Sequence, residues 1–482
     1  MSIDGRFGFG VVGGLGALAG ADVLQRLIRA IDAGSAHDRF AIVFEQQSFP
    51  GDTHRADDGY DPTARKLHAF SLIRRLETRG VDAILLPCFI SHTFVDEIAA
   101  NVNTPIVDLM EALRSALASR HPRARRIGVL TSTYVRSTGL FERRLDAPMS
   151  IVHPSPDGQA ALMDAIYADG GVKSGQVAPA TVERLVAVCN DLARSGCDAI
   201  VPGFTELSLV LPRIAAKVAC PILDPNPCYV EYALAEPIRR PRKPFKIGVV
   251  GGVGPLATVD FMGKVVRLTE AKRDQDHVRM IVEQNPQIPD RTEHLVHGGT
   301  DPTIALFATC RKLEDAEADL IAIPCNTAHA FVERIQPHLR VPVLNMLDET
   351  MAQVASRHPG CTAGLLATTG TIGSGVYAAA AERARVRLIV PDDEHQARVM
   401  DAIYGPAGVK AGHVAGACRD DVDAAIRHLA ERGATVVLLG CTELPLIVPQ
   451  DERFALDGRT IALLDPTMLL AAACVRHARR TM

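Results

Sequence analysis

The chain contains two stretches of the same kind, Ile323-Pro-Cys325-Asn326-Thr327-Ala-His329 and Leu439-Gly440-Cys441-Thr442-Glu443-Leu444. An apolar run precedes each cysteine, over residues 318–323 in the first case and 435–439 in the second. A short apolar run bounded by turn-forming residues is typical of a buried parallel strand. Each cysteine is therefore expected at the carboxyl end of a strand, at the edge where open α/β sheets bind ligands. We infer that the two thiols face one small substrate.

The sequence repeats itself at nearly constant spacing. Gly10-Val-Val-Gly-Gly-Leu-Gly16 returns as Gly248-Val-Val-Gly-Gly-Val-Gly254. Later landmarks return in the same order: Pro87-Cys88 and His92 as Pro324-Cys325 and His329, Ile166-Tyr167 as Ile403-Tyr404, Lys173 as Lys410, and Gly203-Phe204-Thr-Glu-Leu207 as Gly440–Leu444. Such spacing indicates a tandem duplication. We expect one domain over residues 5–238, a basic, proline-rich linker over 239–244 and a second domain over 245–482.

Each half alternates apolar segments with amphipathic ones, which predicts an α/β fold with parallel sheets covered by helices. In the second half, strands are expected at 246–250, 278–283, 320–323, 343–344, 362–366, 387–390, 436–439 and 461–464, and helices at, for example, 300–316 and 417–432. This half looks divided near residue 350. Cys325 would then belong to its first lobe and Cys441 to its second, with a cleft between them.

Composition excludes several classes of protein. The net charge of −4, the absence of Trp and the 5% aromatic content argue against nucleic acid as a partner. No apolar run approaches the roughly 20 residues of a membrane span, and we see no signal peptide. Eleven cysteines without an export signal indicate reduced thiols in a cytoplasmic protein. No CxxC pair exists, which argues against zinc, and no metal is expected.

The glycine loop Gly252-Val-Gly254-Pro-Leu-Ala257 has two interpretations. It loosely fits the dinucleotide pattern GxGxxG/A, but no acidic residue ends the next strand about 20 residues later. The interpretation we favour is a loop whose backbone N–H groups face a substrate carboxylate, with Gly252 and Gly254 in contact with it.

Polar residues around the cysteines suit an anionic substrate. Arg291 follows two prolines in Asn285-Pro-Gln-Ile-Pro-Asp-Arg291-Thr292, where a rigid loop presents a guanidinium for a bidentate carboxylate clamp. Lys410 is a candidate second cation. Donors at a helix N-terminus would bind a carboxylate and lower a thiol pKa; the candidates are Asn326, Thr327 and Thr442. His329 and Glu443 are expected only in supporting roles.

On these residues the second half resembles the cofactor-independent aspartate/glutamate racemase family, and its aspartate racemases in particular. The similarity covers nearly all of 246–482. Its most specific motifs are Ile247–Thr258, Asn285–Thr292, Pro324–His329, Leu365-Leu-Ala-Thr-Thr-Gly-Thr371 and Gly440–Glu443. The resemblance implies two pseudo-symmetric α/β lobes with the active site between them, no cofactor, and an acidic amino acid as the substrate.

The resemblance also implies roles for individual residues. Cys325 and Cys441 are the proton-transfer thiols, and Arg291 and Lys410 bind the side-chain carboxylate. The α-carboxylate contacts are Asn326, Thr327 and Thr442. Inverting a stereocentre by a 1,1-proton shift needs a base on one face of Cα and an acid on the other, and the two cysteines would exchange these roles.

The first half departs from this pattern. Cys88 is retained, but Phe89 and Ile90 replace the Asn and Thr that follow the other cysteine, and Phe204 replaces the second cysteine. Asp52 falls where the second half has its arginine. We therefore expect no aspartate racemisation in this half.

Three interpretations of the first half stay open. We favour a structural domain that mimics the second subunit of a racemase dimer, as an internal pseudo-dimer; a homo-oligomer is the other assembly considered. The half would otherwise bind a regulatory or different ligand, or use Cys88 in a one-cysteine reaction on a more apolar acid. For the whole chain, the alternatives to a racemase are a maleate isomerase, a decarboxylase and a ligand sensor.

Overall fold

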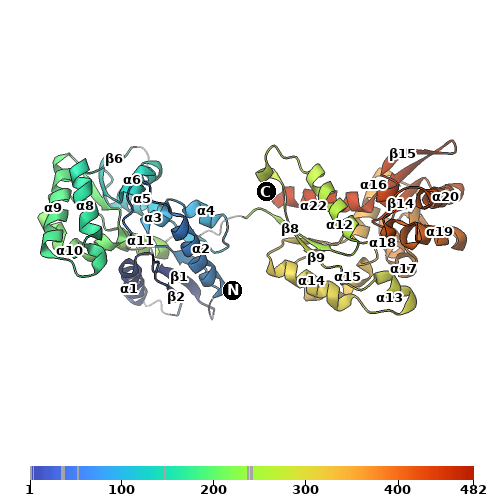
Figure 1. The fold of residues 1–482 in the computed structure, drawn as a ribbon, viewed down its shortest axis with the longest axis horizontal. Helices are drawn as coiled ribbons and strands as arrows, with labels where there is room; N and C mark the ends of the chain where they lie inside the picture. Colours follow the sequence, from blue (N-terminus) through green and yellow to red (C-terminus); the bar gives the residue numbers. More distant parts are fainter. Residues whose placement is uncertain are drawn as a thin grey trace. The chain divides into compact units, whose positions relative to one another are not determined.

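The chain forms two compact units. Figure 1 shows the computed structural model, in which the first unit is Met1–Lys243 and the second is Pro244–Met482. The structure describes residues 3–481 apart from 4, 34–37, 51–53, 146–147, 236–237 and 239–242. Most of the expected linker and Asp52 therefore lie outside the described residues.

The first unit contains two parallel sheets, with strand orders β2-β1-β3-β4 and β6-β5-β7. The strands are β1 (Phe7–Gly13), β2 (Phe40–Gln46), β3 (Ala83–Leu85), β4 (Ile106–Val107), β5 (Arg126–Leu130), β6 (Ser150–Val152) and β7 (Ala199–Pro202). The helices are α1 (Ala17–Ala33), α2 (Thr63–Thr78), α3 (Phe89–His92), α4 (Val95–Ala99), α5 (Leu109–Arg120), α6 (Thr133–Ser137), α7 (Leu140–Arg144), α8 (Pro156–Tyr167), α9 (Pro179–Arg194), α10 (Leu211–Ile214) and α11 (Pro225–Ala235).

The second unit has the same plan, with orders β11-β10-β8-β9 and β13-β12-β14-β16-β15. The strands are β8 (Lys246–Gly251), β9 (Arg279–Gln284), β10 (Leu320–Ala322), β11 (Val343–Leu344), β12 (Thr362–Leu366), β13 (Arg387–Ile389), β14 (Val436–Leu439), β15 (Asp451–Leu456) and β16 (Arg459–Leu464). The helices are α12 (Pro255–Leu268), α13 (Arg291–His297), α14 (Thr303–Asp315), α15 (His329–Ile335), α16 (Met346–Arg357), α17 (Thr369–Gly373), α18 (Val376–Ala384), α19 (Asp393–Tyr404), α20 (Ala417–Glu431), α21 (Leu444–Ile447) and α22 (Pro466–Thr481).

The expected α/β class with helix-covered parallel sheets is confirmed, and the eight expected strands all form. The expected helix 300–316 begins later, at Thr303, because the Asp301 carboxylate accepts hydrogen bonds from the backbone N–H and hydroxyl of Thr303 and Pro302 precedes the first turn. Such a side-chain acceptor replaces the intrahelical partner that the first N–H groups lack.

Strand β15 was not predicted from the sequence. It pairs antiparallel with β16 through a turn at Asp457-Gly458, where both residues have positive φ (49° and 77°). Asp-Gly between two strands is a strong signal of a type I′ hairpin. The signal was therefore present in the sequence, although the polar character of 451–456 concealed the strand.

One helix from each lobe of the second unit packs against the sheet of the other lobe. Helix α16 leaves the first sheet and buries Leu347 and Met351 against Leu365 of the second sheet. Helix α22 leaves the second sheet and buries Leu470 and Cys474 in a core with Ile247 of the first. These reciprocal cores hold the lobes together near residue 350, where the division was expected. No described helix has both the length and the apolar character that a membrane span requires.

Candidate active site

The two cysteines lie where their sheets end. Cys325 stands in the loop between the central strand β10 and helix α15, and Cys441 stands between the central strand β14 and helix α21. Both side chains are buried, at 6% and 8% exposure. Ligands bind at the edge of an open α/β sheet where its strands end. Each lobe has one cysteine at this edge.

Lys410 interacts electrostatically with both cysteines. Burial by itself lowers the pKa of Lys410, but the Glu443 carboxylate and then the sulfurs of Cys441 and Cys325 raise it, and the net shift is upward. A Coulomb interaction of this kind weakens with distance. The ammonium group therefore lies within electrostatic range of both sulfurs.

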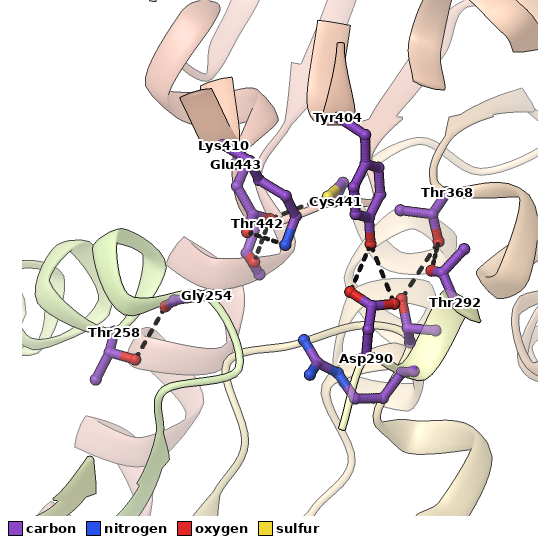
Figure 2. Close-up of polar contacts among 12 residues, drawn as sticks. Gly254, Thr258, Asp290, Thr292, Thr368, Tyr404, Lys410, Cys441, Thr442 and Glu443 are labelled. Carbon is purple, nitrogen blue, oxygen red and sulfur yellow. Dashed lines mark hydrogen bonds and ion pairs between the residues drawn. The ribbon is translucent and has the colours of Figure 1, made fainter. Parts of the chain in front are cut away.

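Glu443 is the direct partner of Cys441. The Cys441 Sγ–H donates to Glu443 Oε2 over 3.0 Å, and the Thr442 hydroxyl donates to the same oxygen over 3.1 Å. The other carboxylate oxygen lies 3.5 Å from the Lys410 ammonium (Figure 2). The hydroxyl proton of Thr442 is therefore used in the hydrogen bond to Glu443.

The pKa of the Cys441 thiol lies well above its ordinary value. Burial is the main cause, and the negative charge of Glu443 and its hydrogen bond add to it, whereas Lys410 opposes it. This corrects the expectation that a helix N-terminus lowers the pKa of this thiol. Helix α21, which follows Cys441, has one turn only and therefore a small dipole. The Glu443 carboxylate contacts the thiol directly. The Cys441 thiol therefore keeps its proton at neutral pH.

Arg291 lies beside the other thiol. Burial lowers the pKa of Arg291, but the sulfur of Cys325 and the carboxylate of Asp290 more than offset this effect, and the net shift is upward. One guanidinium nitrogen donates to the carbonyl oxygens of Ile288 and Pro289, at 3.3 and 3.0 Å, which fixes the side chain. The Nε atom is buried without a hydrogen-bond partner. Because an orphaned buried donor is costly, a ligand oxygen is its expected acceptor.

Asn326 has a similar orphaned donor. Its Oδ1 accepts from the hydroxyl of Tyr377 over 2.6 Å, while its Nδ2 is buried without a partner. Thr327 instead joins a cluster of hydroxyls from both lobes, with 2.6 Å between Thr327 Oγ1 and Thr371 Oγ1. Asn326 thus has a donor to offer a substrate, and Thr327 connects the lobes.

The glycine loop is shaped by close approach. A Cβ at Gly252, where φ is +84°, would stand 2.4 Å from the backbone carbon of Asn285, and a Cβ at Gly254 would stand 2.7 Å from Glu443 Oε1. The Gly252 N–H donates to the hydroxyl of Thr258. That donor faces its own helix, in contrast to the expectation that it faces a substrate. The absence of a Cβ at the two glycines lets the loop that carries Arg291 and the Glu443 side chain approach the backbone of the glycine loop.

His329 supports the loop of Cys325. One ring nitrogen lies 2.9 Å from the Cys325 carbonyl oxygen, and the other accepts from the Met346 N–H over 3.1 Å. Burial lowers its pKa, which keeps the ring neutral for these two bonds. His92 makes the same pair of bonds in the first unit, to the Cys88 carbonyl and the Leu109 N–H. This histidine therefore supports the loop in both units.

Sequence reasoning missed a set of contacts between the two lobes of the second unit. The hydroxyl of Tyr404 donates to Asp290 over 3.1 Å, and Thr292 and Thr368 are hydrogen-bonded at 3.0 Å (Figure 2). Tyr404 also stacks under the Lys410 ammonium at 4.8 Å. Each contact joins the first lobe to the second or holds a cation. The repeated Ile-Tyr landmark and the Asp-Arg-Thr run were the available signals.

The corresponding site of the first unit is a small cavity. Its lining includes Cys88, Phe89, Ile90, Lys173 and Phe204. The volume that water can occupy in this cavity is about 20 Å³, enough for about one water molecule. The ring of Phe204 stands where the second unit has its second thiol, so the described residues of this cavity provide a single thiol.

Each unit contains two sheets, and in the second unit a cysteine follows a strand of each sheet, with cations nearby. These features define a two-lobed α/β protein with polar contacts between its lobes. The sequence model of the Asp/Glu/hydantoin racemase family matches residues 12–233 and 250–474. The chain belongs to this family and contains two copies of its domain in tandem.

Individual relatives cover parts of the chain. A broad specificity amino-acid racemase of Bacillus subtilis, RacX, is 36% identical over 135 residues, 27% of this chain and 58% of that protein. The chain thus spans little more than half of this relative. A glutamate racemase of Limosilactobacillus fermentum is 26% identical over 46% of this chain and 75% of its own length. The solved aspartate racemase of Picrophilus torridus is 31% identical, with a TM-score of 0.42, and covers 49% of this chain and 94% of its own.

Proposed function

We propose that the second unit is an amino-acid racemase that interconverts L- and D-aspartate, or a close acidic amino acid, without a cofactor. Cys325 and Cys441 transfer the proton on opposite faces of the substrate Cα. The family assignment supports racemase chemistry in general. The choice of an acidic substrate is supported by the residues of the site.

One observation supports the proposal most directly: two buried donors near Cys325 lack acceptors. Arg291 Nε and Asn326 Nδ2 are orphaned and buried, and Lys410 interacts with both sulfurs. Two carboxylates of one amino acid would supply the acceptors. A charge-assisted hydrogen bond of this kind contributes about 1.5–3 kcal/mol, so an acidic side chain is favoured over an apolar one.

The residues suggest how the proton moves. In one direction Cys325 acts as the thiolate and takes the Cα proton, while the thiol of Cys441 delivers its own proton to the other face. Cys325 ends as the thiol and Cys441 as the thiolate, and the reverse reaction exchanges the roles. Arg291 and Lys410 compensate the negative charge that passes between the sulfurs and the substrate. Burial of the site keeps water from competing for the proton.

The test uses the intact protein with L-aspartate in D₂O, without added cofactor. We expect loss of the Hα signal in the NMR spectrum and formation of D-aspartate on chiral chromatography. Cys325→Ala and Cys441→Ala should each abolish racemisation. Cys88→Ala, the matched change in the first unit, should leave it unchanged. The absence of both exchange and D-aspartate would overturn the proposal, and a product screen over dicarboxylic acids would then detect an isomerase or decarboxylase.

A further inference from the structure

Three potential metal ligands meet at one end of the second lobe of the second unit. They are Asp392, which precedes helix α19, His395 in its first turn, and His428 near the end of helix α20. One ligand atom from each lies within 4.8 Å of the other two. None of the three belongs to the racemase site described above.

The carboxylate of Asp392 contacts both histidine rings. Its Oδ1 lies 2.7 Å from His395 Nδ1, which is a hydrogen-bond distance, and its Oδ2 lies 3.5 Å from His428 Nε2. Tetrahedral zinc, with ligand bonds of roughly 2.0–2.1 Å, separates its ligand atoms by about 3.4 Å. The spacing to His428 therefore already suits two ligands of one ion, whereas the hydrogen bond to His395 must open before that ring binds.

The lone pair of His428 Nε2 faces two donors. The backbone N–H of Asp392 and a guanidinium nitrogen of Arg432 each lie 3.3 Å from it. An imidazole binds a metal ion through such a lone pair. Arg432 competes with an ion for this lone pair, and it also donates to the Val390 carbonyl oxygen over 2.6 Å.

At least one of the two rings must rotate out of their stack to receive an ion. They stack with 3.9 Å between their centres and 14° between their planes, whereas a ligated metal lies near the plane of each ring. The side chain of His395 is 24% exposed, which leaves it room to rotate about its side-chain bonds. An exposed water would complete the coordination, as in zinc sites with three protein ligands.

The tandem repeat shows that these ligands are not needed for the fold. In the first unit Ser155 takes the place of Asp392: each caps its helix by accepting the N–H three residues on, from Gly158 and from His395 respectively. Asp191 occupies the position of His428, three residues before the end of the matching helix α9. The same helix pair thus forms without any histidine.

We propose that Asp392, His395 and His428 form a binding site for a divalent transition metal of the zinc class, which links helix α19 to helix α20. Imidazole and carboxylate ligands suit Zn²⁺, Co²⁺ and Ni²⁺. The site is separate from the proposed racemase chemistry and holds whether or not that proposal does.

The experiment titrates Co²⁺ into the full-length, chelator-treated protein and follows visible absorption and heat. One ion per chain should bind without a sulfur-to-cobalt charge-transfer band, because the site contains no thiol. His395→Gln and His428→Gln should each weaken binding at least 10-fold. His413→Gln, an exposed histidine of the same lobe, is the matched control and should bind as the parent does.

Arg432→Ala gives a result that a folding defect cannot mimic. Removing the competing guanidinium should tighten Co²⁺ binding several-fold and increase the rise in melting temperature that Zn²⁺ produces, since a ligand of the folded state stabilises it by mass action. Equal Co²⁺ affinity in the parent and His428→Gln would overturn the proposal. So would a thiolate band that disappears in Cys325→Ser, because the ion would then occupy the cysteines.

Discussion

The thiol of Cys441 donates a hydrogen bond to Glu443 over 3.0 Å. A thiol beside a buried carboxylate keeps its proton, and the raised pKa of Cys441 reflects both the burial and this neighbour. In the proposed mechanism this pair makes Cys441 the acid, and its properties can be tested separately from those of Cys325.

Glu443→Gln should shift the alkaline side of the pH–rate profile to lower pH. A negative neighbour raises the pKa of a thiol, so its removal lowers the pKa of Cys441 and the acid form is lost earlier as the pH rises. The measurement is kcat/KM for L-aspartate against pH in both proteins. Glu206→Gln, the equivalent change in the first unit, is the control. An unshifted alkaline limb would show that Cys441 is not the acid whose ionisation limits the rate.

Arg291→Lys should lower kcat/KM for aspartate roughly 10- to 100-fold, because a lysine cannot form a bidentate clamp and the loss of charge-assisted hydrogen bonding costs about 1.5–3 kcal/mol. Steady-state kinetics with L-aspartate measures the change. Arg311→Lys, on helix α14, where the partly exposed Arg311 pairs with Glu314, should keep the parent value. Equal kinetics in Arg291→Lys would remove Arg291 from the substrate clamp.

Gly254→Ala should impair both stability and activity. The backbone there has φ of +113°, and a Cβ would stand 2.7 Å from the Glu443 carboxylate oxygen. Strain at such a position costs about 1–3 kcal/mol, and displacement of Glu443 disturbs Cys441. Denaturant unfolding and kcat are the measurements. Gly16→Ala in the first unit meets Glu206 at the same 2.7 Å and should leave kcat unchanged, whereas a drop equal to that of Gly254→Ala would contradict the assignment of activity to the second unit.

His92 should make the first unit less stable in acid. Burial lowers its pKa from 6.5 to about 4, so between these values the unfolded chain binds a proton that the folded chain does not. Stability therefore falls as the pH drops from about 6.5 towards 4, by at most about 3 kcal/mol. Denaturant unfolding at pH 7 and pH 5 measures the loss. In His92→Gln the protein is less stable at pH 7 but depends less on pH, and an unchanged pH dependence would exclude His92 as its cause.

The sequence predicted those features that depend on local pattern. Apolar runs ending at Cys325 and Cys441 placed both at strand ends, because a buried parallel strand has few other sequence forms. The repeated landmarks revealed the duplication and the loss of the second thiol at Phe204. The strand over 451–456 escaped because its residues are polar, although Asp457-Gly458 marked the turn.

Contacts between distant segments could not be read from the sequence. Lys410 interacts electrostatically with both cysteines, and the Tyr404 hydroxyl donates to Asp290. The thiol of Cys441 contacts a carboxylate that raises its pKa, whereas helix capping had predicted a lower one. The sequence by itself determined the α/β class, the tandem organisation and the position of the two cysteines at strand ends, since these follow from periodicity and repetition. Only the tertiary structure decided which charges surround each thiol, because burial and partners brought together across two lobes set the protonation state of a side chain.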